Sequence, residues 1–302
     1  MGCNSWRAVK RSDLLPGYVT MAVLFEHAMT EHQARKRFGQ NFLVDQRIIN
    51  HIVRSIRPQA GDNLVEIGPG KGAITALLLN ACPNLNVVEL DRDLIPILKA
   101  TFSEYPNLVV HQADALKFDF SALATEQNPL RIVGNLPYNI STPLIFHLLS
   151  FRALVRDMHF MLQKEVVLRM AAQVGDNNYG RLGIMTQYFC QVEHLFDVGP
   201  ECFRPVPKVE SAIVRLTPHR QLPFQAKSHE ALEGVVRTAF SQRRKTLRNA
   251  LKLVFNDQQL EDAGLNPNLR PENVALAQYV QLANTYTQIH GNSVLSAAGL
   301  PE

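Results

Sequence analysis

The stretch Asn63-Leu-Val-Glu-Ile-Gly-Pro-Gly-Lys-Gly72 joins a short apolar run to a turn in which every second residue is glycine. The apolar run at 63–67 predicts a buried strand. The glycines permit a tight turn and let a ligand approach the backbone closely. Apolar residues then recur at helical spacing over 73–80, so the stretch predicts a strand–turn–helix unit.

Short apolar runs and helical periods continue to alternate after this unit. Strands are predicted at residues 85–90, 108–112, 131–134, 158–162, 195–198 and 212–216, and helices at 93–102 and 164–173. Ser141 or Thr142 can cap a further helix that has Pro143 in its first turn. The last two strands have no obvious helix between them and are expected to pair antiparallel. The pattern predicts an α/β fold with a doubly wound, mostly parallel, seven-stranded Rossmann-like sheet.

The chain has a different pattern after Pro218. Apolar residues recur at helical spacing over 229–240, 246–255 and 274–286, with no strand signal between them. We therefore predict a small C-terminal all-helical domain over 218–302, preceded by a cofactor-binding sheet domain over 29–217. Residues 1–28 match neither pattern and are predicted to be a disordered extension.

Composition narrows the classes of protein to consider. Hydrophobic residues make up 46% of the 302 residues, which is enough for a sizeable core. No apolar run is long enough to predict a membrane span. The four cysteines are scattered, which argues against a zinc site or a disulfide framework and suits a reducing cytoplasm.

Two clusters of basic residues stand out against a mild net charge of +4. They consist of Arg35, Lys36 and Arg37, and of Arg243, Arg244, Lys245 and Arg248. A cluster of this kind is often only a solvated face. Because both flank a predicted cofactor fold, we interpret them as candidate RNA-binding residues.

Acidic residues follow the predicted strands where a nucleotide-type cofactor would need them. Glu89 closes the second strand, about 20 residues after the glycine turn, and can accept hydrogen bonds from ribose hydroxyls. Asp114 follows the third strand and could meet an adenine's exocyclic amine. The pattern alone fits a NAD enzyme, or a purely structural turn, just as well. Glu66 would repel a pyrophosphate but tolerate a cationic sulfonium, which favours S-adenosylmethionine.

The tetrapeptide Asn135-Leu136-Pro137-Tyr138 ends the fourth strand, at the same edge of the sheet as the glycine turn. The Asn135 side-chain oxygen and the backbone carbonyl of Leu136 or Pro137 could each accept one N6–H of an adenine. Two acceptors would hold the amine and favour its pyramidal, nucleophilic state. Tyr138 offers a flat face on which the base can stack. The alternative is a strand followed by a Pro-Tyr turn, with Asn135 as a cap.

Three aromatic residues are ambiguous. Phe203 lies in a proline-rich loop and is a candidate for the opposite face of the base, although a lone aromatic there is more often core. Phe38 and Phe42 flank Asn41 in a segment that could fold over the cofactor, with Asn41 forming a hydrogen bond.

Several motifs together resemble one known family, the small-subunit ribosomal RNA adenine dimethyltransferases. They are Arg37-Phe-Gly-Gln-Asn-Phe-Leu43, Glu66-Ile-Gly-Pro-Gly70, Glu89-Leu-Asp91, Gly134-Asn-Leu-Pro-Tyr-Asn-Ile-Ser141, Gln163-Lys-Glu165, Phe203-Arg-Pro-Val-Pro-Lys-Val209 and Gln242-Arg-Arg-Lys245. They occur in the family's order between residues 33 and 285.

The resemblance implies that two adjacent adenosines in the 3′-terminal hairpin loop of 16S rRNA each receive two methyls on N6. It also implies action on the small ribosomal subunit or its late precursor. The residues expected to contact S-adenosylmethionine are Asn41, Leu43, Gly68, Glu89, Asp114 and Asn135. A monomer in the cytoplasm would suffice for this activity.

Three other functions compete with this prediction. Relatives that methylate one adenine of large-subunit rRNA share the catalytic tetrapeptide, although the segment 240–249 is more similar to the small-subunit type. A nicotinamide-dependent oxidoreductase would use the same fold but leave the tetrapeptide without a role. A non-catalytic ribosome-assembly factor would bind rRNA through the second basic cluster alone.

Overall fold

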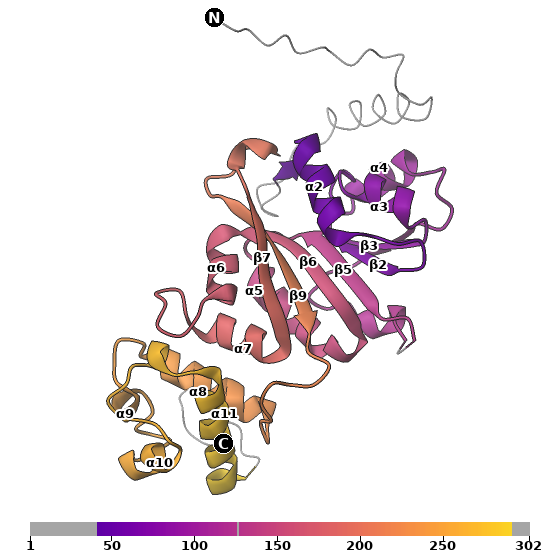
Figure 1. The fold of residues 1–302 in the computed structure, drawn as a ribbon. Helices are drawn as coiled ribbons and strands as arrows, with labels where there is room; N and C mark the ends of the chain where they lie inside the picture. Colours follow the sequence, from indigo (N-terminus) through magenta and orange to yellow (C-terminus); the bar gives the residue numbers. More distant parts are fainter. Residues whose placement is uncertain (1–40, 126, 292–302) are drawn as a thin grey trace, which may run out of the picture.

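The computed structural model describes residues 41–125 and 127–291 (Figure 1). The predicted extension over 1–28 and the first basic cluster lie outside these residues. The predicted limits of the two domains, 29–217 and 218–302, stay predictions.

A seven-stranded sheet forms the centre of the structure, with the strand order β4-β3-β2-β5-β6-β9-β7. The strands are β2 (Asn63–Ile67), β3 (Leu85–Glu89), β4 (Val109–Gln112), β5 (Leu130–Asn135), β6 (Val155–Gln163), β7 (Cys190–Val198) and β9 (Ser211–Pro218). The first five pair in parallel, and β9 runs antiparallel to both β6 and β7. The predicted mostly parallel sheet and its antiparallel end are confirmed. The chain reverses its direction across the sheet between β2 and β5, which creates a crevice at their carboxyl ends.

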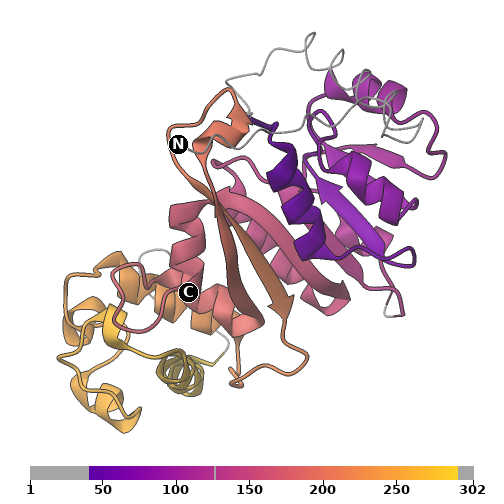
Figure 2. The ribbon, with the colours of Figure 1, turned by 45° about the horizontal axis from the view of Figure 1, so that its top comes forward.

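Helices cover both faces of this sheet (Figures 1 and 2). On one face, α2 (Gln46–Ile56), α3 (Thr75–Ala81) and α4 (Leu94–Thr101) share an apolar core with β2 and β3. On the other face, α5 (Ser141–Ser150), α6 (Lys164–Ala171) and α7 (Arg181–Phe189) share a second core with β5 and β6. The pattern did not predict α2 or α7.

The start of α5 differs from the expected cap. Ile140 precedes the helix in a right-handed helical conformation, and no side chain accepts a capping hydrogen bond there. The Ser141 hydroxyl instead donates to the Tyr138 carbonyl at 3.1 Å. The turn after β5 therefore runs directly into the helix, because its last residue is already helical. Pro143 does lie in the first turn.

The described residues after β9 contain helices and no strand, as predicted. The helices are α8 (His229–Ser241), α9 (Leu247–Ala250), α10 (Asp257–Asp262) and α11 (Leu276–His290). The helix predicted over 246–255 is shorter, because turns replace it after Ala250 and Asn256 already caps α10. Val235 of α8 and Tyr279 of α11 belong to the same core as Ile184 of α7, so the helical part packs directly on the sheet domain.

Candidate active site

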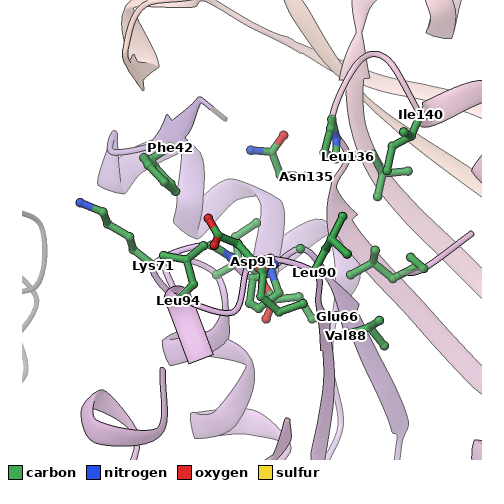
Figure 3. Close-up of a pocket in the computed structure, with 18 of the residues that line it drawn as sticks. Phe42, Glu66, Lys71, Val88, Leu90, Asp91, Leu94, Asn135, Leu136 and Ile140 are labelled. Carbon is green, nitrogen blue, oxygen red and sulfur yellow. Dashed lines mark hydrogen bonds between the residues drawn. The ribbon is translucent and has the colours of Figure 1, made fainter. Parts of the chain in front are cut away.

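A cavity opens where the carboxyl ends of β2, β3 and β5 meet the segment 41–43 (Figure 3). Every residue of the glycine turn except Gly72 lines it, together with Glu66, Glu89, Asp114 and the whole tetrapeptide from Asn135 to Tyr138. The predicted cofactor residues Asn41, Leu43, Gly68, Glu89, Asp114 and Asn135 all line this cavity. Asn41 and Asn135, which are 94 positions apart in the chain, therefore meet at one edge of the sheet.

The glycine turn depends on left-handed backbone angles. Gly68, Gly70 and Gly72 have φ values of 65°, 60° and 87°, which only glycine adopts without strain. A Cβ on Gly72 would also lie 2.5 Å from the Phe102 ring. A Cβ on Gly68 would lie 3.6 Å from the Asn135 carbonyl oxygen, so the turn comes directly against the end of β5.

Two carboxylates hold the loops that follow β3 and β4. Glu89 accepts hydrogen bonds from the backbone N–H groups of Asp91 at 2.7 Å and Gly70 at 3.4 Å. Burial raises the pKa of Glu89. Asp114 accepts from the Leu116 N–H at 3.0 Å and so acts as a turn residue at the cavity wall. Each carboxylate thus has a structural role in addition to facing the cavity.

Glu66 is a third carboxylate, at the base of the cavity. Its side chain is 2% exposed, and its Oε2 accepts from the Thr75 hydroxyl at 2.6 Å. Burial raises the pKa of Glu66 from 4.5 to about 7. The carboxyl can therefore change its charge near neutral pH, and a nearby cation would favour the ionised form. Sequence motifs alone do not identify Thr75 as its partner.

The tetrapeptide presents its polar groups from the end of β5. The Asn135 Nδ2 donates to the Asn41 carbonyl at 3.3 Å, which holds the side chain over the cavity (Figure 3). The Pro137 carbonyl accepts from the Ile140 N–H at 3.1 Å within the turn. The Leu136 carbonyl has no such bond among the described residues, so it is the better placed of the two predicted acceptors.

Tyr138 is anchored to the start of β9. Its hydroxyl and the Ser211 hydroxyl, which begins β9, lie 2.9 Å apart and share a hydrogen bond. The ring itself is half-buried and lines the cavity. The anchor leaves the ring available as a flat surface and limits its rotation.

Phe203 does not lie where a residue that covers the opposite face of the base would have to lie. Strand β1 (Phe42–Leu43) pairs antiparallel with β8 (Phe203–Arg204), a contact that the sequence did not predict. The Phe203 side chain is 1% exposed, packs in one core with Leu43 and does not line the cavity. In this arrangement the ring has no face open to a base, because the β1–β8 pairing encloses it.

Known proteins decide between the remaining families. Residues 31–288 match the ribosomal RNA adenine dimethylase family. The chain belongs to this family. The predicted family and enzyme class are therefore confirmed.

Similar proteins extend this result. The chain is 66% identical over 257 residues to the ribosomal RNA small subunit methyltransferase A of Saccharophagus degradans, covering 85% of this chain and 96% of that protein. Among solved structures it is similar to a dimethyladenosine transferase from Plasmodium falciparum, with a TM-score of 0.68 and 28% identity over 80% of this chain and 95% of that one. It is also similar to the 23S rRNA methyltransferase ErmE, with a TM-score of 0.63, 26% identity and coverage of 82% and 100%.

The second basic cluster of this dimethylase lies on the helical part. The Arg243 guanidinium donates to the Asn177 carbonyl at 2.6 Å, and Arg248 pairs with Asp257 at 2.8 Å. Arg244 and Lys245 are exposed and have no ion pair among the described residues. Arg35, Lys36 and Arg37 lie outside the described residues, so the first cluster stays a prediction.

Two features do not occur among residues 41–125 and 127–291. No helix there is long and apolar enough to cross a membrane. No group of three His, Cys, Asp or Glu side chains there could hold a metal ion.

Proposed function

We propose that this chain transfers methyl groups from S-adenosylmethionine to N6 of two adjacent adenosines in the 3′-terminal hairpin loop of 16S rRNA. Each adenosine would be dimethylated during assembly of the small subunit. One observation carries the proposal: the glycine turn and Asn135 line a single cavity, where a Cβ on Gly68 would lie only 3.6 Å from the Asn135 carbonyl oxygen. A methyl donor at the turn and an acceptor amine at the tetrapeptide would therefore be neighbours. The 66% identity to a small subunit methyltransferase A supports the small-subunit target.

The cavity residues fit S-adenosylmethionine. Glu66 is a buried carboxyl at the cavity's base, which suits a cationic ligand better than a pyrophosphate. The backbone at Gly68 would come close to the ligand, and Glu89 would accept from ribose hydroxyls. Asn41, Leu43 and Asp114 would complete the contacts, with Leu43 giving the apolar part. When bound, the cofactor supplies an electrophilic methyl group on a sulfonium.

The tetrapeptide would prepare the adenine amine. The lone pair of N6 is delocalised into the ring, so the amine is a poor nucleophile until it becomes pyramidal. The Asn135 side-chain oxygen and the Leu136 carbonyl would each accept one N6–H and stabilise that geometry. Pro137 restricts the backbone so that the carbonyl of Leu136 keeps its direction. Tyr138 would stack on the base.

This mechanism needs no side-chain base. The nitrogen becomes strongly acidic only once it has received the methyl group, so water can take the proton. Catalysis would then depend on holding N6 in line with the methyl group, an effect of orientation. An adenine within a stack cannot reach the cavity, so the target base must be flipped out.

The partner proposed here is 16S rRNA within the small subunit or its late precursor, bound by a monomer in the cytoplasm. Arg243, Arg244, Lys245 and Arg248 would contact phosphates from the helical part. Arg35, Lys36 and Arg37 would add contacts near the cavity. Phe203 would reach the second face of the base only if the β1–β8 pairing opened.

The test is methyl transfer from labelled S-adenosylmethionine to undermethylated small subunits. Asn135→Ala is expected to abolish transfer with little loss of stability, because the side chain is only partly buried at a strand end. Asn84→Ala is the matched control, since Asn84 is exposed at the opposite edge of the sheet, before β3. Near-normal transfer by Asn135→Ala would contradict the mechanism.

The wild-type chain in the same assay separates the competing functions. Label in a 16S adenine supports the proposal, whereas label in 23S rRNA would favour the large-subunit type. Cofactor binding without transfer would indicate an assembly factor. Binding of NAD in place of S-adenosylmethionine would indicate an oxidoreductase.

A further inference from the structure

Helix α2 carries a cationic surface that the proposed mechanism does not use. Arg47, Arg54 and Arg57 are exposed. Arg47 and Arg54 are seven residues apart, which places them on one side of the helix, and Arg57 directly follows its last residue. The Arg47 side chain is 92% exposed. No aspartate or glutamate occurs between Asp45 and Asp62. We call Arg47, Arg54 and Arg57 the α2 arginines.

Two of the acidic groups beside this helix are ion-paired. Asp62 is 6% exposed and pairs with the buried Arg131 at 2.6 Å and with Arg156 at 3.0 Å. Asp45 caps the helix and pairs with Arg47 at 3.3 Å. Arg54 and Arg57 have no ion pair among the described residues. The surface therefore keeps a net positive charge.

Arg57 occupies a position that favours glycine. It follows α2 with φ 52° and ψ 57°, and it is the one non-glycine residue with positive φ in the part of the chain that the structure describes. A side chain there costs conformational energy that glycine would avoid. The position ends the helix and its carbonyl accepts from Arg131 at 3.2 Å, but glycine would supply the same carbonyl. The strain therefore points to a role for the arginine side chain itself.

An aromatic pair lies beside the α2 arginines. The exposed His51, one turn before Arg54 and Ser55, stacks on Phe196 of β7 with ring centroids 3.9 Å apart and planes 6° apart. Flat rings among arginines are typical of surfaces that bind RNA, since bases stack on the rings and phosphates pair with the guanidinium groups.

The position of α2 connects this surface with the cavity. Leu43 lines the cavity, and α2 begins three residues later, at Gln46. The helix of 11 residues then extends about 16 Å over the outer face of the sheet, as Figures 1 and 2 show. An RNA strand that places a base in the cavity could therefore continue along α2.

We propose that the α2 arginines form a second rRNA-binding surface, which holds backbone phosphates of the rRNA next to the target loop. The surface is separate from Arg243–Lys245, which follow the end of α8, and Figure 1 shows α8 below α7. RNA is the partner that best fits this surface, which combines the exposed Arg47, the unpaired Arg54 and Arg57, and a flat aromatic pair. The inference rests on the proposed function, because it assumes that the base in the cavity belongs to rRNA.

The test compares two triple variants of the full chain in binding to undermethylated small subunits between 50 and 200 mM KCl. One variant replaces Arg47, Arg54 and Arg57 by Gln. The control removes the same charge elsewhere, through Lys99→Gln, Lys117→Gln and Arg220→Gln, all at exposed positions. Each lost phosphate contact lowers the salt slope of log K by about 0.9. Three contacts would thus reduce the loss of affinity over this range by about 40-fold, and the control should behave like wild type.

Arg57→Gly gives an independent readout. It removes the strain and the charge together, so the melting temperature should rise by about 1–4 °C while the affinity for small subunits falls. If Arg57 were purely structural, the substitution would raise the stability and leave the affinity unchanged. That result would overturn the role given to Arg57.

The remaining outcomes have distinct meanings. An unchanged salt slope in the arginine triple variant, with normal transfer by wild type, overturns the α2 surface and leaves the proposed function intact. Weaker binding to subunits but unchanged binding to the isolated 16S rRNA would indicate a ribosomal protein as the partner and overturn the RNA contact. Absence of transfer by wild type overturns the proposed function, and with it this inference. Binding of S-adenosylmethionine should be the same in all variants.

Discussion

Glu66→Gln tests how burial controls the charge at the base of the cavity. The carboxyl is 2% exposed, and its pKa is raised from 4.5 to about 7. A raised folded-state pKa means that the protonated form stabilises the fold. This contribution is fully present below pH 4.5 and is lost as the pH rises through 7. At about 1.4 kcal/mol per pH unit, the loss amounts to about 3 kcal/mol.

Glutamine keeps the oxygen that accepts from Thr75 but never ionises. The variant and the wild type should therefore have similar free energies of unfolding at pH 4.5. At pH 8 the variant should be more stable by about 3 kcal/mol. Urea unfolding of the ligand-free chain at a series of pH values measures this difference. Glu165→Gln, at an exposed position on α6, is the control and should show no such pH dependence.

The same variant should bind S-adenosylmethionine more weakly, because an amide cannot balance a positive charge. Wild-type affinity should rise as the pH increases through 7, by roughly tenfold for each pH unit by which the ligand lowers the pKa of Glu66. Parallel stability curves for variant and wild type from pH 4.5 to 8 would refute the burial argument. Unchanged affinity of the variant would refute the electrostatic fit to a cation.

Further substitutions test the turn, the core and the stacking face. Gly72→Ala should destabilise the fold by about 2–4 kcal/mol, because the residue has a φ of 87° and its new Cβ would clash with Phe102. Gly175→Ala, with a φ of 89° and open space around the new Cβ, should cost about 1 kcal/mol. Equal losses in urea unfolding would contradict the steric argument. Arg131→Met should cost about 3–5 kcal/mol, because Asp62 and Asp157 lose their buried cationic partner and keep only the half-exposed Arg156. A thermal melt close to wild type would show that this ion network contributes little. Tyr138→Phe should keep methyl transfer within about fivefold, while Tyr138→Ala should lower kcat/KM by about 10–100-fold; similar losses in both would exclude stacking.

Much of the fold could be predicted because its signals are local. The apolar run at 63–67 coincides with β2, and each of the other six predicted strands is present. Helix α2 was missed although its signals are also local. Ile49, Ile52 and Ile56 recur at helical spacing, and Asp45 is a recognisable N-cap. Attention to capping residues before the first strand would have found it.

The pairing of β1 with β8, in contrast, has no local signal in the sequence. Each strand has two residues, and the partners Leu43 and Phe203 are separated by 160 positions. So short a strand has no periodicity of its own, and its pairing depends on where the whole sheet brings the two segments together. For the same reason the sequence could not show that the Phe203 ring is enclosed.

The cavity depends both on local sequence signals and on the folded structure. Strand ends of a parallel sheet converge at one edge, so the strand order in the sequence already implied that Gly68, Glu89 and Asn135 would be neighbours. Which polar atoms remain free for a substrate was decided only by the backbone conformation of the folded chain. The Pro137 carbonyl is used by the turn, while the Leu136 carbonyl is not. Hydrogen bonding in a turn depends on the direction of each backbone group, and residue type alone does not specify that direction.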